Sequence, residues 1–255
     1  MSRMSINISE VFPHLTSAPI VEAVIDIRAK SSVALDESIA RNFLEPRLNG
    51  YNFLDSQQEF SHQFMFGADT PPQQTMIHAW KGVRFRSADE KTIAQFNKDG
   101  FVCSKITPYQ NWEAFSEESL HLWKIFQDMA SPEEVNRLGL RFINRIELPA
   151  GDGNFENYIS PAPQSPRGID LPFFGFLHQE TLSVPGHPYV INLIRTIQPP
   201  QDNDGFSVII DIDVFTGDAV SFEEKSIEGR LEEMRWLKNK MFFGSLTDQA
   251  LEAFK

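Results

Sequence analysis

Three arginines in the segment RLGLRFINRI are the residues best suited to bind a charged group. They are Arg137, Arg141 and Arg145, each four positions after the one before. In a β-strand such residues share one face, with neighbours roughly 13 Å apart at about 3.3 Å per residue. Guanidinium groups bind carboxylates and phosphates through paired hydrogen bonds. The spacing therefore predicts a row of candidate sites for an anionic ligand or a protein partner.

Four carboxylates on two other segments carry the opposite charge. In VIIDIDVF, Asp211 and Asp213 alternate with apolar residues, and in APIVEAVIDI, Glu22 and Asp26 do the same. Each segment is therefore predicted to be a strand with one charged face and one apolar face. An unpaired guanidinium is costly to bury, so in one interpretation the carboxylates form ion-pair ladders with the arginines. Each such pair contributes about 0.2–1 kcal/mol.

In the other interpretation, the charged strand faces line a cleft or barrel interior that holds an anion on the arginines. The carboxylates Glu22, Asp26, Asp211 and Asp213 are then candidate ligands of a divalent metal, which prefers oxygen donors. Metal-dependent phosphohydrolases of the triphosphate-tunnel type have this arrangement, although their E-x-E-x-K signature is missing here. The D-x-D spacing fits haloacid-dehalogenase phosphatases, sugar-nucleotide transferases and nucleotidyltransferases only in part, because their flanking motifs are missing.

Other reactive side chains show no supporting pattern. The six histidines lack the H-x-x-x-H and H-E-x-x-H spacings of zinc sites. Cys103 lies within a predicted strand and is interpreted as a small core or surface residue rather than a nucleophile. Neither a P-loop nor G-x-G-x-x-G occurs. We therefore expect no cofactor, with a divalent metal only in the phosphohydrolase alternative.

The composition of the 255 residues narrows the class of protein. The net charge of −12 argues against general nucleic-acid binding, because phosphate backbones attract basic surfaces. A single cysteine is compatible with a reducing compartment. Residues 1–12 lack the apolar core of a signal peptide, and no run approaches the ~18 apolar residues of a membrane span. These features predict a cytoplasmic protein without membrane attachment, and they leave homo-oligomerisation open.

Apolar residues recurring at strand and helix spacings predict the elements that position these side chains. Twenty-two phenylalanines favour a sheet-rich core. Strands are expected over residues 19–28, 59–66, 75–87, 92–97, 101–106, 135–148, 173–184, 189–197 and 206–215. Helices are expected over residues 36–48, 111–129 and about 221–241, with a short final helix after Thr247.

Local signals predict how several of these elements begin or bend. The expected N-caps are Asp36, Thr247 and Ser221, the last in a capping box with Glu224. Residues 131–134 (Ser-Pro-Glu-Glu) resemble a second capping box, for a single helical turn. Residues 75–87 form either one long strand or a hairpin bent at Lys81-Gly82.

The order of these elements predicts an α+β fold of two related halves. Each half consists of antiparallel sheet covered by long amphipathic helices, and the halves pack as one compact unit. The first half comprises residues 1–149 and the second residues 173–255. Residues 150–172, which are rich in Gly, Pro, Ser and Asn, are expected to connect them.

Five phrases of the chain, taken in order, resemble a known family. They are APIVEAVIDI, ITPYQNWEAF, RLGLRFINRIELP, VIIDIDVF and LKNKMFFGSLTDQALEAF. This set is similar to a sporadically distributed bacterial family of uncharacterised proteins of about this length, over nearly the whole chain. The resemblance implies no agreed activity and no catalytic residues. Such a patchy distribution is typical of accessory genes on mobile or defence-related islands.

Taken together, these observations favour a non-enzymatic binding or regulatory module of an accessory kind. Its charged sheet face is expected to bind an anionic ligand or a protein partner. The tunnel-type phosphohydrolase and a structural subunit of a larger complex are the alternatives. The sequence favours a binding protein over an enzyme without deciding between them.

Overall fold

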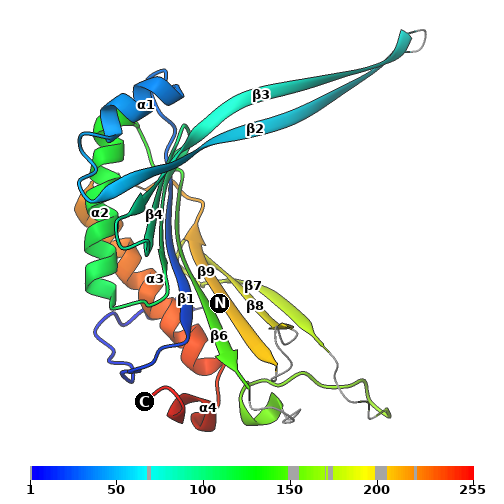
Figure 1. Cartoon of the computed structure of the whole chain (residues 1–255). Helices are drawn as coiled ribbons and strands as arrows, with labels where there is room; N and C mark the ends of the chain where they lie inside the picture. Colours follow the sequence, from blue (N-terminus) through cyan, green and yellow to red (C-terminus); the bar gives the residue numbers. More distant parts are fainter. Residues whose placement is uncertain are drawn as a thin grey trace.

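The described part of the chain forms one antiparallel sheet with helices on one side. A computed structural model describes residues 2–67, 70–148, 155–169, 171, 175–198, 206–220 and 223–255. Within these residues there are nine β-strands in a single sheet, four α-helices and one short 3-10 helix (Figure 1). The α+β class and the antiparallel sheet predicted from the sequence are confirmed.

The strands follow one another across the sheet in the order β2-β3-β4-β5-β1-β6-β9-β8-β7. Their bounds are β1 Ile20–Arg28, β2 Tyr51–Gly67, β3 Thr70–Ser87, β4 Thr92–Asn97, β5 Gly100–Ile106, β6 Arg137–Glu147, β7 Leu177–Ser183, β8 Tyr189–Gln198 and β9 Ser207–Thr216. The central neighbours β1, β6 and β9 are far apart in sequence. They bring together the three segments whose charged residues the sequence singles out.

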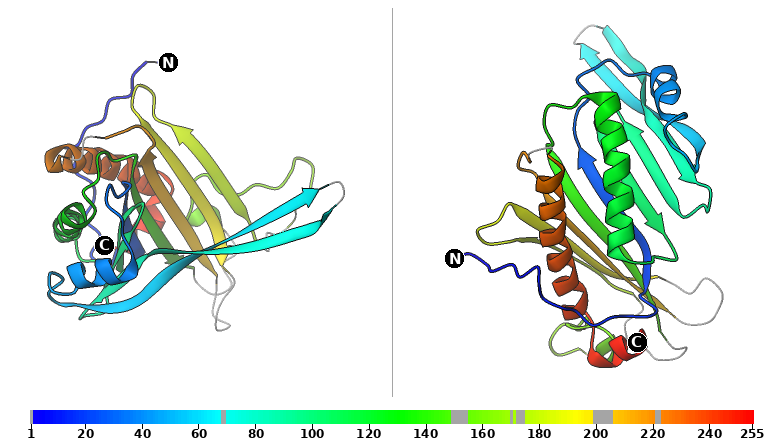
Figure 2. Two further views of the ribbon diagram at one scale, coloured as in Figure 1. Left: turned by 90° about the horizontal axis from the view of Figure 1, so that it is seen from above. Right: turned by 90° about the vertical axis from the view of Figure 1, so that its left-hand side faces the viewer.

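Two long helices lie side by side on one face of this sheet. The helices are α1 Glu37–Leu44, α2 Trp112–Ala130, α3 Glu224–Gly244 and α4 Asp248–Glu252, and the 3-10 helix η1 is Phe155–Asn157. Both further views place α2 and α3 against the same face (Figure 2). Among the described residues, the opposite face of the central strands carries no helix (Figure 1). The central strands therefore have one face toward the helices and one face without helices.

The alternation of apolar residues in the central strands explains which face meets the helices. Ala23, Ile25 and Ile27 of β1 are fully buried. They pair across the strands with Phe142 and its buried neighbours on β6. Because side chains alternate between the two faces of a strand, the charged residues between them point to the other face. The register thus places the apolar core under the helices, as the period-two pattern predicts.

Aromatic side chains of α2 pack into this core. Phe115, Trp123 and Phe126 are buried. Trp123 and Phe126 stack with ring centroids 5.3 Å apart, and Phe115 meets Phe142 of β6 edge-on at 6.5 Å. The Asn111 side chain accepts a 2.8 Å hydrogen bond from the backbone N–H of Ala114 at the start of the helix. Burial of large aromatic area is the main stabilising contribution of such a helix.

The hairpin β2–β3 extends well beyond the body of the protein and is longer than the sequence predicts (Figure 1). No hairpin turn occurs at Gly82: β3 continues through it as one strand and pairs with both β2 and β4, with a register irregularity at Lys81. A Cβ at Gly82 would lie 2.5 Å from the backbone oxygen of Phe96. The glycine therefore permits a close approach of two strands, which is a second common use of glycine in sheets.

Two of the predicted helix starts are wrong, and Asp36 and Thr247 are confirmed as caps. Ser131 ends α2 in the left-handed conformation, with φ of 44°, and no helical turn follows it. Ser131 is therefore the C-cap of α2 and not the N-cap of a new turn, because its backbone N–H donates a hydrogen bond to the carbonyl of Gln127. Helix α3 begins at Glu224, with Glu223 as N-cap and without a side-chain capping bond. Ser221 lies outside the described residues.

Candidate functional site

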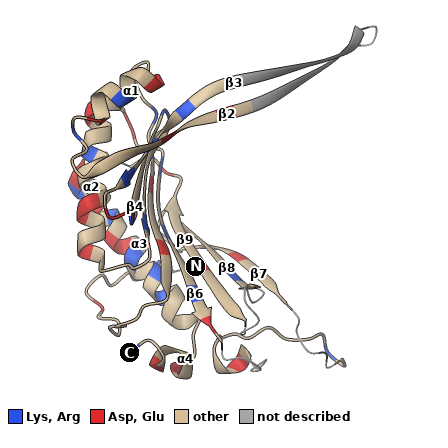
Figure 3. Ribbon diagram, in the orientation of Figure 1, with Lys and Arg blue, Asp and Glu red and all other residues tan. Residues whose placement is uncertain are grey.

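The open face is the side of the central strands β1, β6 and β9 that points away from α2 and α3. Figure 3 shows residues of both charge signs along these strands. The residues that define the open face are Glu22, Val24, Asp26, Arg28, Arg137, Gly139, Arg141, Ile143, Arg145, Ile209, Asp211, Asp213 and Phe215. All three arginines and all four carboxylates singled out by the sequence therefore lie on it.

Arg137 joins all three central strands through its guanidinium group. Its Nη1 lies 2.5 Å from Oδ2 of Asp26 on β1, and its Nη2 lies 3.1 Å from Oδ2 of Asp213 on β9. The same guanidinium lies over the ring of Phe215, 4.7 Å from its centroid. Gly139 makes this possible, because a Cβ there would lie 2.6 Å from Nη1 of Arg137. The guanidinium thus crosses the strand where a larger residue would block it.

Arg141 forms a two-pronged pair with Asp211 on the neighbouring strand. Nε donates to Oδ1 at 2.8 Å, and Nη2 donates to Oδ2 at 2.5 Å. Asp211 is 8% exposed, whereas the side chain of Arg141 is 46% exposed. The hydrogen bonds that Arg141 donates to Asp211 raise the pKa of Arg141 above its ordinary value. This is the geometry in which an arginine–carboxylate pair is strongest.

Arg145 and Arg28 complete the network at its two ends. Arg145 donates from Nε to the hydroxyl of Ser207 at 3.1 Å and pairs with Glu147 at 2.7 Å. Arg28 pairs with Asp26 at 2.9 Å and with Asp99 at 3.2 Å. The arginines of the open face are therefore all engaged with carboxylates, which agrees with the ion-pair interpretation of the sequence.

Burial changes the protonation behaviour of Asp213, the partner of Arg137. Desolvation, the largest effect, raises the pKa of Asp213 above its ordinary value together with the nearby carboxylates of Asp211 and Asp26. Arg137 and Arg141 act in the opposite direction and do not cancel this increase. The ionised carboxylate is therefore less well accommodated here than its ion pair alone suggests. The carboxylates Asp211 and Asp213 of the open face are thus partly shielded from solvent.

The arrangement lends no support to a metal centre on the open face. Within the described part of the chain, no group of three or more His, Cys, Asp or Glu is placed to hold an ion. Asp26, Asp211 and Asp213 are engaged with arginines. Glu22 acts electrostatically on Arg141 but forms no ion pair with a described residue. The described strands also form an open sheet with β2 and β7 at its ends, rather than the closed barrel that a tunnel requires.

Half-buried apolar side chains lie between these ion pairs. Val24, Ile143, Ile209 and Phe215 occupy alternate positions along the strands and are only partly exposed. Val24 is directly opposite Arg141 in the strand register. The open face is thus a mixed surface, in which apolar and paired charged groups alternate over short distances.

Cys103 lies on the opposite face of β5 and is fully buried. Burial raises the pKa of its thiol to about 12. Because the thiolate is the reactive form, Cys103 is not an activated nucleophile. The structure places it as a small core residue, one of the two positions that the sequence allows.

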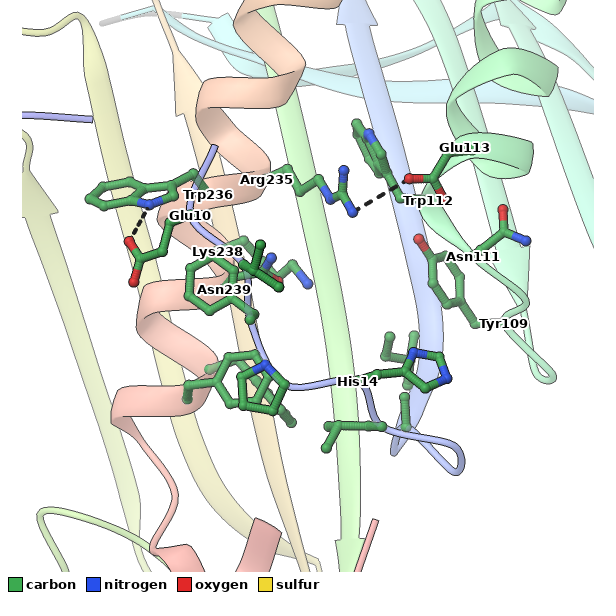
Figure 4. Close-up of a pocket in the computed structure, with 18 of the residues that line it drawn as sticks. Glu10, His14, Tyr109, Asn111, Trp112, Glu113, Arg235, Trp236, Lys238 and Asn239 are labelled. Carbon is green, nitrogen blue, oxygen red and sulfur yellow. Dashed lines mark hydrogen bonds and ion pairs between the residues drawn. The ribbon is translucent and has the colours of Figure 1, made fainter. Parts of the chain in front are cut away.

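A cavity on the helix side was not predicted from the sequence. It has a volume of about 770 Å³ and lies between the N-terminal residues 8–20, the start of α2 and one side of α3 (Figure 4). Lys238 of α3 is among its lining residues. The signal for this residue was present, since Lys238 follows Ile227, Leu231 and Met234 at the spacing of the apolar stripe. A lysine in an apolar helix stripe either extends its ammonium group to solvent or contributes it to a binding site.

Comparison with known proteins leaves the function open. No protein-family model matches the chain, and no curated protein matches it. None of the described helices is both long enough and apolar enough to cross a membrane. The function must therefore be argued from the open face and the cavity themselves.

Proposed function

We propose that this protein is a non-enzymatic binding module whose open face docks a protein partner. One observation carries the proposal: the central strands present ordered ion pairs and half-buried apolar side chains on a face where the described chain has no helix. Protein interfaces typically combine an apolar centre with arginines and polar groups. An antiparallel sheet commonly packs one face on the core and exposes a polar face to water. The apolar side chains on the open face are unusual for a solvated face, and they would be buried by a bound partner.

The charges favour a protein over a small anion as the occupant. The arginines of the open face already have carboxylate partners, and Glu22 adds a further negative charge. A phosphate or carboxylate ligand would have to displace Asp211, which is almost fully buried beside Arg141. A protein surface can instead add hydrogen bonds around the existing pairs and exclude water from them.

The outer strands support the same proposal. The hairpin β2–β3 and the strands β7 and β8 extend on the side away from α2 and α3 (Figure 1). Both β2 and β7 are end strands in the described sheet. These arms would flank a partner seated on the open face and would enlarge the contact area beyond the central strands.

We further propose that the fold is a duplication of one sheet-plus-helix unit. In support, β1 pairs with β5, the last strand before α2, and β6 pairs with β9, the last strand before α3. The boundary would then fall in the connection between α2 and β6, earlier than residues 150–172. The proposed role as an accessory protein of the cytoplasm rests on the composition and on the family resemblance.

Site-specific photocrosslinking in the host cell tests the docking proposal. A photoreactive p-benzoylphenylalanine replaces Val24 in one variant and Ile209 in another. The matched control carries it at Lys124, an exposed position of α2 on the helix side. We expect both open-face variants to form the same protein adduct and the control to lack it. Adducts at Lys124 alone, or none at either open-face position, would contradict the proposal.

A thermal-shift screen separates this proposal from an anion site. Polyphosphates, nucleotides and divalent metals are tested against the wild type and Arg141→Ala. A ligand at a hundred times its Kd adds about 2.7 kcal/mol to the stability of the folded state, which is readily seen as a higher Tm. We expect no such increase. An increase that is lost in Arg141→Ala would instead establish an anionic ligand on the open face.

A further inference from the structure

Lys238 is a positively charged group without a counter-ion in the described structure. Its side chain is half-buried, and its Nζ lies over the ring of Phe142, 4.1 Å from the centroid. Among the described residues it makes no hydrogen bond and no ion pair. Arg235 on the same helix has the same sign and acts on Lys238 electrostatically. A partly desolvated ammonium in this position lacks the partner that such groups require.

The carboxylates that line the cavity do not meet this need. Glu10 accepts hydrogen bonds from Trp236 and Lys240 at 2.7 and 2.6 Å. Glu232 accepts from the indole N–H of Trp112 at 2.5 Å and pairs with Arg235. Glu113 pairs with Arg235 at 3.6 Å, as Figure 4 shows. Each carboxylate near Lys238 is therefore engaged with another donor.

The cavity has the size and the walls of a small-molecule site. Its volume of about 770 Å³ falls within the range of roughly 300–1,000 Å³ that is typical of ligand pockets. Its aromatic lining residues are Phe12, Tyr109, Trp112, Trp236, Phe242 and Phe243. The hydroxyl of Tyr109 makes no hydrogen bond to a described residue and lies on the same side of the cavity as Trp112 (Figure 4). The aromatic walls can therefore pack against the apolar part of a small ligand, and the Tyr109 hydroxyl is available as a hydrogen-bond donor.

We propose that this cavity binds a small monocarboxylate with an apolar body, whose carboxylate pairs with the Nζ of Lys238. The carboxylate supplies the missing counter-ion, and the apolar body packs against the aromatic walls. The single unpaired cation of the described lining matches a single negative charge on the ligand. This inference is independent of the open face, because the cavity lies on the other side of the sheet.

Binding should be linked to the uptake of a proton. Desolvation, with a smaller effect from Arg235, lowers the pKa of Lys238 to about 7. At pH 8 only about one tenth of the free protein then carries the charge. A bound carboxylate favours the ammonium form, so the affinity should fall about tenfold for each pH unit above 7.

Other charged groups around the cavity are accounted for. The titratable and charged groups that line the cavity with Lys238 are Glu10 and His14 from the N-terminal segment, Tyr109 and Glu113 before and at the start of α2, and Glu232 and Arg235 from α3. From β6, the facing residues Phe142 and Asn144 do not titrate. His14 is the one histidine of this set, and histidine is the side chain type whose charge most often changes near neutral pH. A His14→Gln variant is therefore part of the experiment.

Fluorescence titration measures the proposed binding directly, since Trp112 and Trp236 line the cavity. The probes are 3-phenylpropionate, indole-3-acetate and octanoate, with 3-phenylpropionamide as the uncharged match of the first. We expect saturable binding of the carboxylates below about 1 mM at pH 7, and at least tenfold weaker binding of the amide. Calorimetry at pH 8 in two buffers of different ionisation enthalpy should detect close to one proton taken up per ligand.

Variants at Lys238 decide whether this side chain is responsible. Lys238→Met should abolish carboxylate binding, and Lys238→Arg should retain it without the pH dependence. Lys225→Met, at an exposed position of the same helix, and His14→Gln should behave as the wild type. No saturable binding of any carboxylate up to about 10 mM, equal binding of the amide, or unchanged binding by Lys238→Met would overturn the proposal.

Discussion

At the scale of single residues, Asp211 and Asp213 occupy neighbouring positions on one strand face and differ in surroundings. Asp211 is almost fully buried and receives both prongs of Arg141. Asp213 pairs with Arg137, and burial raises its pKa. The two carboxylates should therefore contribute unequally to stability, although the sequence presents them as equivalent members of a D-x-D motif.

Asp211→Asn is expected to lower the free energy of unfolding by about 1–2 kcal/mol at pH 7. The introduced amide would direct a donor at the guanidinium and leave Arg141 without its charge partner. The half-exposed Arg141 can turn toward water, which limits the loss. Urea denaturation measures the change. Asp213→Asn is the control and should cost less than about 0.5 kcal/mol; equal losses would contradict the assignment of Asp211 as the stronger partner.

Lys238→Met is expected to raise the stability of the protein at pH 7. The pKa of Lys238 is lowered in the folded state, so the unfolded chain binds more protons than the folded one above pH 7. Stability in the wild type should therefore increase as the pH rises from 7 to 8.5. In Lys238→Met this increase should be smaller, as followed by Tm across that range. A variant with the same rise as the wild type would show that Lys238 titrates normally.

At the scale of elements, a glycine in a strand and a glycine in a helix have opposite roles. Gly139 of β6 lies under the guanidinium of Arg137, whereas Gly229 of α3 has open space where a Cβ would be. The strand glycine therefore permits the ion-pair network, and the helix glycine only adds backbone freedom.

Gly139→Ala is accordingly expected to destabilise the protein by about 1–3 kcal/mol, because the added methyl group displaces Arg137 from Asp26 and Asp213. Gly229→Ala is expected to stabilise it by about 0.5–1 kcal/mol through helix propensity. Both are measured by chemical denaturation. A neutral effect at Gly139 would mean that Arg137 reaches its partners by another path.

At the scale of the whole molecule, the sheet separates two environments. One side holds the aromatic core under α2 and α3, and the other presents the open face. Cys103 lies at the core side of β5, fully buried. Its reactivity therefore reports on opening of the sheet as a whole rather than on local motion.

The thiol of Cys103 is expected to resist alkylation by iodoacetamide at pH 8 in the native protein. Its pKa of about 12 leaves little thiolate, and the side chain has no exposed surface. Modification should become complete in urea above the unfolding transition, as monitored by mass spectrometry. Rapid labelling of the native protein, faster than global unfolding allows, would show that β5 opens independently of the rest of the sheet.

The sequence by itself determined the faces of the strands and the starts of several helices. Asp36 and Thr247 were recognisable as caps because the capping bond joins residues three apart. The charged and apolar faces around Arg141 and Asp211 followed from a period of two. These properties depend on neighbours in the chain, so a single sequence contains them.

Only the tertiary structure decided which strands are neighbours and in which register. The placement of β6 between β1 and β9 sets Arg137 between Asp26 and Asp213, although 111 and 76 residues separate them. The same packing sets Lys238 over Phe142 and leaves it without a counter-ion among the residues that the structure describes. Such contacts join residues far apart in sequence, and their energies depend on burial and on the exact set of neighbours, which no local pattern contains.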